Sequence, residues 1–178
     1  MQKLFFVFCI VVLAIGCNNE KPATAETKAA TPQEPVTYAI TPSYSSSFEI
    51  GNAAYGAMIV KGSWKDWEDN TMDNMKSWCA DTIVAVMADN MIATGVDSLQ
   101  ARWKRGRTSY TNVIDTVHSV ISVRSTDKNE NWVLIWAKEI NTNTKGVKDT
   151  TELMETWRIN KDGKADWLLQ YDRHHRKQ

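Results

Sequence analysis

Cysteine is scarce in this chain, with three among 178 residues, at Cys9, Cys17 and Cys79. The first two lie in an N-terminal segment that differs in composition from the rest, so one thiol remains in the body of the chain. A single thiol cannot form an internal disulfide. No cysteine and histidine residues combine at metal-ligand spacing, so we expect neither a metal ion nor another cofactor.

An excess of charge is also absent. The chain has 21 Lys and Arg residues against 21 Asp and Glu residues, a formal net charge of +0. Nucleic-acid-binding domains carry a basic excess, so we do not expect a nucleic-acid partner. The basic residues at 102–107 and 173–177 are predicted to lie on solvated surface.

Long apolar runs are limited to one, residues 4–15, which Lys3 precedes. This run is shorter than the roughly 20 apolar residues of a membrane-spanning helix and is typical of a signal peptide. Small residues then precede Cys17, which resembles the lipobox of bacterial lipoproteins. Ala14 stands where that motif usually has leucine, and Leu13 lies one residue earlier. We predict a signal peptide at 1–16 and lipidation of Cys17; the alternative is an ordinary cleavable signal.

Residues 17–45 have no apolar periodicity and contain all four prolines, Pro22, Pro32, Pro35 and Pro42. Such a segment buries too little surface to offset its ordering entropy, so we predict a disordered linker. It would tether a single domain at 46–178 to a membrane of the cell envelope. By resemblance to sorting signals, Asn18 after the cysteine favours the outer membrane.

The periodicity of the domain changes from helical to extended along the chain. Helices are predicted at 46–69, with N-caps at 45–47, over a short segment after Thr71, and from a capping box of Asp97 and Gln100. The third helix is expected to carry Leu99, Trp103, Tyr110 and Ile114 on one face.

Strands are predicted at 79–87, as a short extended piece at 91–94, and then at 117–124, 132–142, 150–160 and 165–173. Asp162-Gly163 is the strongest hairpin signal between the last two strands. The expected fold is α+β, with about three N-terminal helices packed on one face of a curved antiparallel sheet.

Two stretches, residues 64–81 (WKDWEDNTMDNMKSWCAD) and 155–164 (ETWRINKDGK), resemble the nuclear-transport-factor-2-like superfamily, including its SnoaL-like polyketide cyclases and its ketosteroid isomerases. In that family the first helix ends in a similar turn, an "A-D" pair opens a strand, and a "DGK" turn joins the last two strands. The resemblance extends over nearly all of 46–173. It implies a cone-shaped fold that encloses a pocket, and a sheet face that forms a homodimer.

The same resemblance implies positions for catalytic groups. The isomerases have a base six residues after the Asp of the "A-D" pair and a tyrosine on the first helix. These positions correspond here to Met87 and to Ser63, which argues against isomerase chemistry. Other pocket carboxylates remain as weak catalytic candidates, namely Glu155, which alternates with Leu153 and Trp157, and Asp81. Each has a plain alternative: a solvent-side position for Glu155, as for Glu139, and a local cap for Asp81.

Eight tryptophans in the domain supply large apolar surfaces. The residues expected on interior faces, and so the candidates for a ligand pocket, are Trp67, Trp78, Met87, Trp103, Tyr110, Trp136, Trp157 and Tyr171. Core packing alone explains most of them; a cavity lined by several would bind a small apolar or aromatic molecule. We therefore expect a non-catalytic ligand-binding or dimeric interaction domain. The alternative is a SnoaL-like isomerase, cyclase or dehydratase with a pocket carboxylate as general base.

Overall fold

The computed structural model of the chain describes residues 36–174, and residues 40–174 of these belong to one compact unit. The expected signal peptide, Cys17 and residues 17–35 of the expected linker lie outside the described residues. Within the described part, no helix has the length and apolar character needed to cross a membrane.

The first helical stretch is continuous but changes its winding. It comprises α1 (Ala53–Ile59), a π-helical segment η1 (Val60–Lys65) and α2 (Asp66–Asp69). The Asn52 side chain caps it by accepting a hydrogen bond from the Ala54 amide at 3.0 Å. It ends at Asn70, whose left-handed φ of 58° stops the helix where the Asp-Asn pair predicts.

The predicted start of this helix at residue 46 is wrong. Phe48–Ile50 instead forms the edge strand β1, which pairs with the end of strand β4 (Tyr110–Ser125). The reason lies at Gly51, whose amide donates to the Ser122 carbonyl at 2.8 Å. A Cβ at Gly51 would lie 2.9 Å from the Val123 carbonyl carbon, so the chain can pass this closely only as glycine.

The segment that follows packs around the helix. It contains η2 (Met72–Asn74), α3 (Met75–Trp78), β2 (Cys79–Val86), β3 (Ile92–Thr94) and α4 (Val96–Arg107). The predicted strands at 79–87 and 91–94 are confirmed as β2 and β3. The predicted capping box is wrong, because Gly95 occupies the N-cap and Gln100 donates to the Met72 carbonyl at 2.7 Å.

The third helix is also shorter than its apolar pattern predicts. It ends at Arg107, and Tyr110 and Ile114 lie on the next strand. The four apolar residues on which the prediction is based come from two elements: Leu99 and Trp103 lie on α4, and Tyr110 and Ile114 lie on the strand. From Tyr110 onwards the chain pairs residue by residue with a long neighbouring strand, and these ladder hydrogen bonds override the local pattern.

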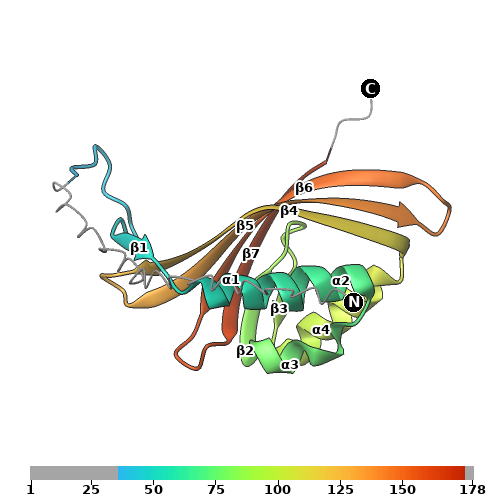
Figure 1. Cartoon of the computed structure of the whole chain (residues 1–178), viewed down its shortest axis with the longest axis horizontal. Coiled ribbons are helices and arrows are strands. Elements are labelled where there is room, and N and C mark those ends of the chain that lie inside the picture. Colours follow the sequence, from blue (N-terminus) through green and yellow to red (C-terminus); the bar gives the residue numbers. More distant parts are fainter. Residues whose placement is uncertain (1–35, 175–178) are drawn as a thin grey trace, which may run out of the picture. The chain divides into compact units, whose positions relative to one another are not determined.

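Four long strands form an antiparallel meander, as predicted: β4 (Tyr110–Ser125), β5 (Glu130–Asn143), β6 (Lys148–Ile159) and β7 (Ala165–His174). The seven-stranded sheet has the order β1-β4-β5-β6-β7-β2-β3. Its pairings are antiparallel except that β2 runs parallel to β7. The helices lie against one face of this curved sheet (Figure 1). The fold class is therefore α+β, as predicted.

The core lies between the helices and that face. Ile59 and Leu99 from the helices meet Ile135 and Trp157 from the strands, and all four side chains are fully buried. Trp78, Trp103 and Trp157 pack against one another with ring centroids 5.7–6.5 Å apart. This aromatic cluster keeps the helices and the sheet at the separation that leaves a cavity beside it.

Candidate functional site

A cavity of about 300 Å³ lies between the helices and the sheet. The strand side of its lining follows from the two-residue period of a β-strand. On β6 the lining residues are Asp149, Thr151, Leu153 and Glu155; β5 contributes Glu139 and Asn141, and β7 contributes Gln170, Asp172 and His174. The sheet therefore presents a wall that is mostly polar and acidic.

The opposite wall is aromatic. Trp64 and Trp67 come from the first helical stretch, Trp103 from α4 and Tyr110 from the start of β4. The Trp67 ring packs edge-to-face on Trp103 at 6.3 Å and on Tyr110 at 6.5 Å. The π-helical turn η1 occurs where the helix passes the cavity, and Ser63 and Trp64 on it both line the cavity. Such turns are frequent at functional sites.

Glu155 is the deepest carboxyl group of the cavity, with 3% of its surface exposed. Its two carboxylate oxygens accept hydrogen bonds from Gln170 Nε2 and Trp157 Nε1, both at 2.9 Å. Burial raises the pKa of Glu155 to about 7, because desolvation outweighs these donors. Near neutral pH this group therefore exists in both protonation states.

Glu139 is held by two donors from different elements. Trp67 Nε1 donates to one carboxylate oxygen at 2.6 Å, and Asn141 Nδ2 donates to the other at 3.0 Å. Burial and the charges of Glu139 and Asp149 raise the pKa of the Tyr110 hydroxyl, and all three residues line the cavity. Glu139 thus stands in a fixed position at the boundary of the two walls.

Asp115 lies directly across the strand pair from Glu139. Both of its carboxylate oxygens are buried, and they find no hydrogen-bond partner within the described part of the chain. Burial raises the pKa of Asp115 to about 8, and Glu139, Glu68 and Glu155 add to the effect, while Arg107 opposes it. The raised pKa therefore favours the neutral acid form of Asp115 at pH 7, and Asp115 does not line the cavity.

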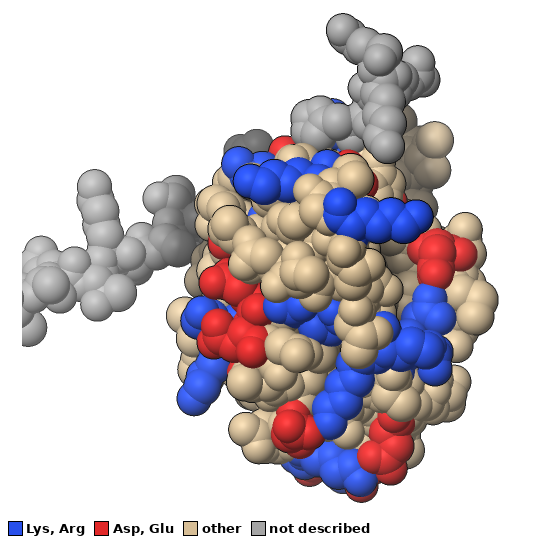
Figure 2. Space-filling view, turned by 90° about the vertical axis from the view of Figure 1, so that its right-hand side faces the viewer, with Lys and Arg blue, Asp and Glu red and all other residues tan. Residues whose placement is uncertain are grey.

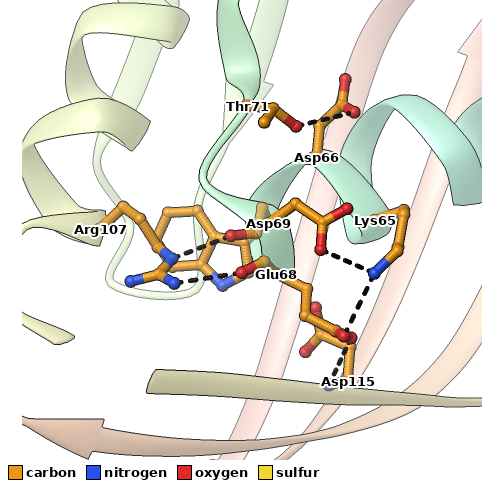
Figure 3. A network of polar contacts seen from close by, with 8 residues as sticks. Lys65, Asp66, Glu68, Asp69, Thr71, Arg107 and Asp115 are labelled. Atoms are coloured by element: carbon orange, nitrogen blue, oxygen red, sulfur yellow. Dashed lines mark hydrogen bonds and ion pairs between the residues drawn. The ribbon is translucent and has the colours of Figure 1, made fainter. Parts of the chain in front are cut away.

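Arg107 is buried and not solvated, contrary to the expectation for residues 102–107. Its guanidinium donates to the carbonyls of Trp67, Glu68 and Tyr110 at 2.9–3.1 Å. It thereby joins the end of α2 to the start of β4, and Figure 3 shows its bonds to the backbone at the end of α2. Since all these acceptors are backbone carbonyls, the positive charge of Arg107 is not paired directly with a cavity carboxylate.

The eight predicted pocket residues fall into three groups. Trp67, Met87, Trp103 and Tyr110 line the cavity, while Trp78 and Trp157 are buried in the core beside it. The prediction that Trp136 and Tyr171 face the interior is wrong. Both line a hollow on the opposite face of the sheet, where Tyr171 is 57% exposed. Trp136 and Tyr171 both pair with Met154, the residue before Glu155 on β6. Successive residues of a strand point to opposite faces, so Trp136 and Tyr171 point away from the face that carries Glu155.

The two weak catalytic candidates also separate. Glu155 lies in the cavity, whereas Asp81 is exposed on β2 and does not line it. Glu139 was expected to share a solvent-side position, and this is wrong because it lies on the same sheet face as Glu155. Counting by twos from the buried Ile135 places Glu139 on the inner face, so the sequence contained this signal. Ser63 and Met87, which the sequence resemblance aligns with catalytic positions of the ketosteroid isomerases, both line the cavity.

The outer surface carries charges of both signs. On the face in Figure 2, acidic and basic side chains are interspersed. Ion pairs such as Lys65–Asp69 and Lys76–Asp97, each at 2.7 Å, are exposed and contribute little to stability. Among the described residues, no group of three or more His, Cys, Asp or Glu side chains is arranged to hold a metal ion.

No model of a protein family matches this chain, and no curated protein matches it. Solved structures are similar to it in fold. A nuclear-transport-factor-2-like protein of unknown function from Burkholderia pseudomallei is 14% identical, with 68% of this chain and 91% of that chain covered and a TM-score of 0.53. An LEH-like epoxide hydrolase from M. tuberculosis is 11% identical (67% and 84% covered, TM-score 0.53). A hypothetical protein with a ketosteroid isomerase-like fold from Catenulispora acidiphila, in complex with trimethylamine, is 17% identical (64% and 83% covered, TM-score 0.50).

Proposed function

Since the chain has the nuclear-transport-factor-2-like fold, we propose that its domain binds a small molecule in the cavity between helices and sheet, without transforming it. One observation carries this proposal: a cavity of about 300 Å³ has an aromatic wall on one side and a polar wall on the other. Its volume is at the lower limit of small-molecule sites, so the ligand is compact. The Catenulispora acidiphila protein, which has the same fold, is itself a complex with a small molecule.

The polar wall further restricts the chemical character of the ligand. Glu139, Asn141 and Gln170 offer hydrogen bonds opposite Trp67 and Trp103, so the ligand is amphipathic and not purely apolar. Met87 cannot accept a proton, and Ser63 is less acidic than a tyrosine. Both lie at the cavity, and this supports binding over the isomerase reaction.

A variant that fills the cavity tests this proposal. Leu153→Trp adds bulk inside the cavity, and Leu134→Trp adds the same bulk on the opposite face of the sheet. Benzyl alcohol, phenethylamine and choline serve as compact probes in thermal-shift titrations. We expect at least one to raise the melting temperature of the wild-type protein and of Leu134→Trp, but not of Leu153→Trp. Equal shifts in all three proteins, or none in any, would contradict binding in the cavity.

The second candidate function is proton transfer by Glu155. Its favouring observation is a carboxyl group inside the cavity whose pKa, raised by burial, is about 7, as a general base at neutral pH requires. Such a base would remove a proton from the carbon next to a carbonyl and return a deuteron in D₂O. Exchange of cyclohexanone α-protons, followed by NMR, measures this directly. Catalysis would be supported over simple binding if the protein exchanges these protons faster than buffer does, if Glu155→Gln abolishes this exchange, and if Glu152→Gln retains it.

We also propose that the protein is anchored to a membrane of the cell envelope, at the outer membrane, through acylated Cys17. The apolar run at 4–15 and the small residues before Cys17 support this. Cys17→Ala is expected to move the protein to the soluble fraction and to remove the mass of the lipid. Cys79→Ala is the matched control, because Cys79 is buried in the domain. Membrane retention of Cys17→Ala would refute lipid anchoring at this residue.

A homodimer through the sheet is the remaining part of the proposal. The face opposite the helices has an apolar hollow of about 390 Å³, lined by Tyr44, Phe48, Ile121, Val123, Trp132, Leu134 and Thr156. We call this surface the outer apolar patch. Several of its side chains are exposed, Phe48 and Ile121 among them, and exposed apolar surface of this kind is typical of an interface.

A further inference from the structure

We infer that the ligand of the cavity is a compact organic cation, such as a quaternary ammonium compound, with Glu139 as its fixed counterion and the tryptophan rings around it. This inference rests on the proposed small-molecule binding and adds the chemical class of the ligand. Three features of the cavity carry it: its charge, the shape of its aromatic wall, and the way in which Glu139 is held.

The charge of the cavity is one-sided. Its titratable lining groups are four carboxyl groups, Tyr110 and His174, and no lysine or arginine lines it within the described residues. The carboxyl groups are those of Glu139, Glu155, Asp149 and Asp172. His174 lies between the two aspartates, 3.5 Å from Asp149 and 3.2 Å from Asp172. The inner carboxylates, Glu139 and Glu155, form no ion pair with any described basic side chain, and the positive group that would complement them is absent from the described lining. The carboxylates of the lining would repel an anionic ligand.

The nearest buried positive charge does not fill this role. Arg107 directs its donors to the carbonyls of Trp67, Glu68 and Tyr110, on the far side of the aromatic wall. It is not a lining residue of the cavity, so its guanidinium is unavailable to a ligand there. A cation that enters the cavity therefore does not compete with an existing partner for Glu139.

The aromatic wall suits a cation on geometric grounds. The Trp67 ring meets Trp103 at an interplanar angle of 70° and Tyr110 at 73°, so the rings present differently oriented surfaces. A cation within about 6 Å of such rings is attracted by their negative faces, and recognition of quaternary ammonium groups uses several rings at once. A neutral ligand of the same shape gains the apolar contact but not this attraction.

Glu139 is held in place before any ligand arrives. Trp67 Nε1 and Asn141 Nδ2 occupy one position on each carboxylate oxygen, and each oxygen retains acceptor capacity for a ligand. Trp67 thus belongs to the aromatic wall and also positions the carboxylate. This arrangement joins the two recognition elements of an organic cation through a single indole.

The test uses three probes of similar size and branching: choline, its neutral isostere 3,3-dimethylbutan-1-ol, and 3,3-dimethylbutanoate, which has a carboxylate in place of the hydroxymethyl group. Isothermal titration of the full chain in detergent at pH 8 measures each dissociation constant. We expect choline to bind at least tenfold more tightly than the alcohol, and the anion not to bind. Glu139→Gln should weaken choline at least tenfold and affect the alcohol much less, because the amide keeps the size of the side chain and one acceptor oxygen but loses the charge.

The controls separate this inference from the proposed function. Glu152→Gln removes a carboxylate on the opposite face of the sheet, beside His118, and should leave choline binding unchanged. If choline and the alcohol bind equally and Leu153→Trp blocks both, small-molecule binding stands and the cationic ligand is wrong. If none of the three probes binds, or if Glu139→Gln has no effect on choline, the inference is overturned as well.

Discussion

At the scale of single residues, the unusual feature is a set of acidic side chains on the buried face of the sheet. Asp115, Glu139 and Glu155 lie on neighbouring strands, and the like charges raise the pKa of Asp115. Buried carboxyl groups cost stability when they ionise, because desolvation disfavours the charged form. Their retention beside a cavity is typical of a functional site, where charge is placed for a ligand.

Asp115 makes this cost measurable. Folding raises the pKa of Asp115 from its ordinary value of 3.8 to about 8, so the folded state holds more protons than the unfolded state between these values. Stability is therefore highest below about pH 4 as far as this group is concerned, and it falls as pH rises towards 8. Asp115→Asn has no such dependence, because the amide does not ionise.

We expect Asp115→Asn to be more stable than wild type at pH 9, by about 1 kcal/mol or more after allowance for solvent screening at a half-buried group. At pH 5 the difference should be smaller, and below about pH 4 it should vanish, because Asp115 is then neutral in both the folded and the unfolded state. Urea unfolding at both pH values measures the difference. A variant as stable as wild type at pH 9 would show that Asp115 ionises without penalty.

At the scale of the elements, the first helical stretch depends on one close approach. A Cβ on Gly62 would lie 2.5 Å from Nε1 of Trp78 and 2.6 Å from another atom of that indole. Trp78 is buried in the aromatic cluster and cannot move aside without disturbing Trp103 and Trp157. Glycine at position 62 thus allows the π-helical segment to lie flat on the cluster, and so positions Ser63 and Trp64 at the cavity.

Gly62→Ala is expected to destabilise the protein by about 1–3 kcal/mol, the usual cost of overpacking a core. Gly106→Ala in α4 is the matched control, because its Cβ would meet Trp67 at an ordinary 3.6 Å. That change should be neutral or stabilising by up to about 1 kcal/mol, since alanine favours the helix. Thermal unfolding of both variants compares them. Equal effects at the two positions would mean that the contact with Trp78 relaxes freely.

At the scale of the whole domain, the two faces of the sheet differ in their surroundings and in the residues that they expose. One face packs against the helices and lines the cavity, and the other carries the outer apolar patch. Tyr44 and Trp132 pack edge-to-face at 5.8 Å in this patch, and Trp132 also packs on Trp167 at 5.7 Å. In the proposed homodimer, such a preformed aromatic surface would lose little side-chain entropy on burial.

Ile121→Lys places a charge in the centre of the outer apolar patch and is expected to convert a dimer to a monomer. Sedimentation velocity of the full chain in detergent at micromolar concentrations, with the mass of bound detergent subtracted, measures the mass of the protein. Val147→Lys is the control, because Val147 is exposed in the turn between β5 and β6 and lies outside the patch. A wild-type protein that sediments as a monomer at all concentrations would exclude the proposed homodimer.

Local patterns in the sequence predicted most of the elements. Alternation over long strands predicted the meander from β4 to β7, and the Asp162-Gly163 turn is confirmed with a φ of 75° at Gly163. The helix stop at Asn70 is confirmed for the same reason, because a left-handed residue ends a helix through its own backbone geometry. These features depend on interactions between residues close together in the chain, so they can be predicted from a single sequence.

The errors all arise where distant segments meet. Phe48–Ile50 became a strand through its pairing with β4, and the face of Trp136 and Tyr171 depended on a strand register. The carboxylate of Glu139 is held in position by a hydrogen bond from Trp67, which lies 72 residues away in the chain. The sequence by itself determined the order of helices and strands and the fold class, because period and turn chemistry are local. The tertiary structure alone decided which carboxylates share the cavity with the tryptophans, because pairing register and burial join residues far apart in the chain.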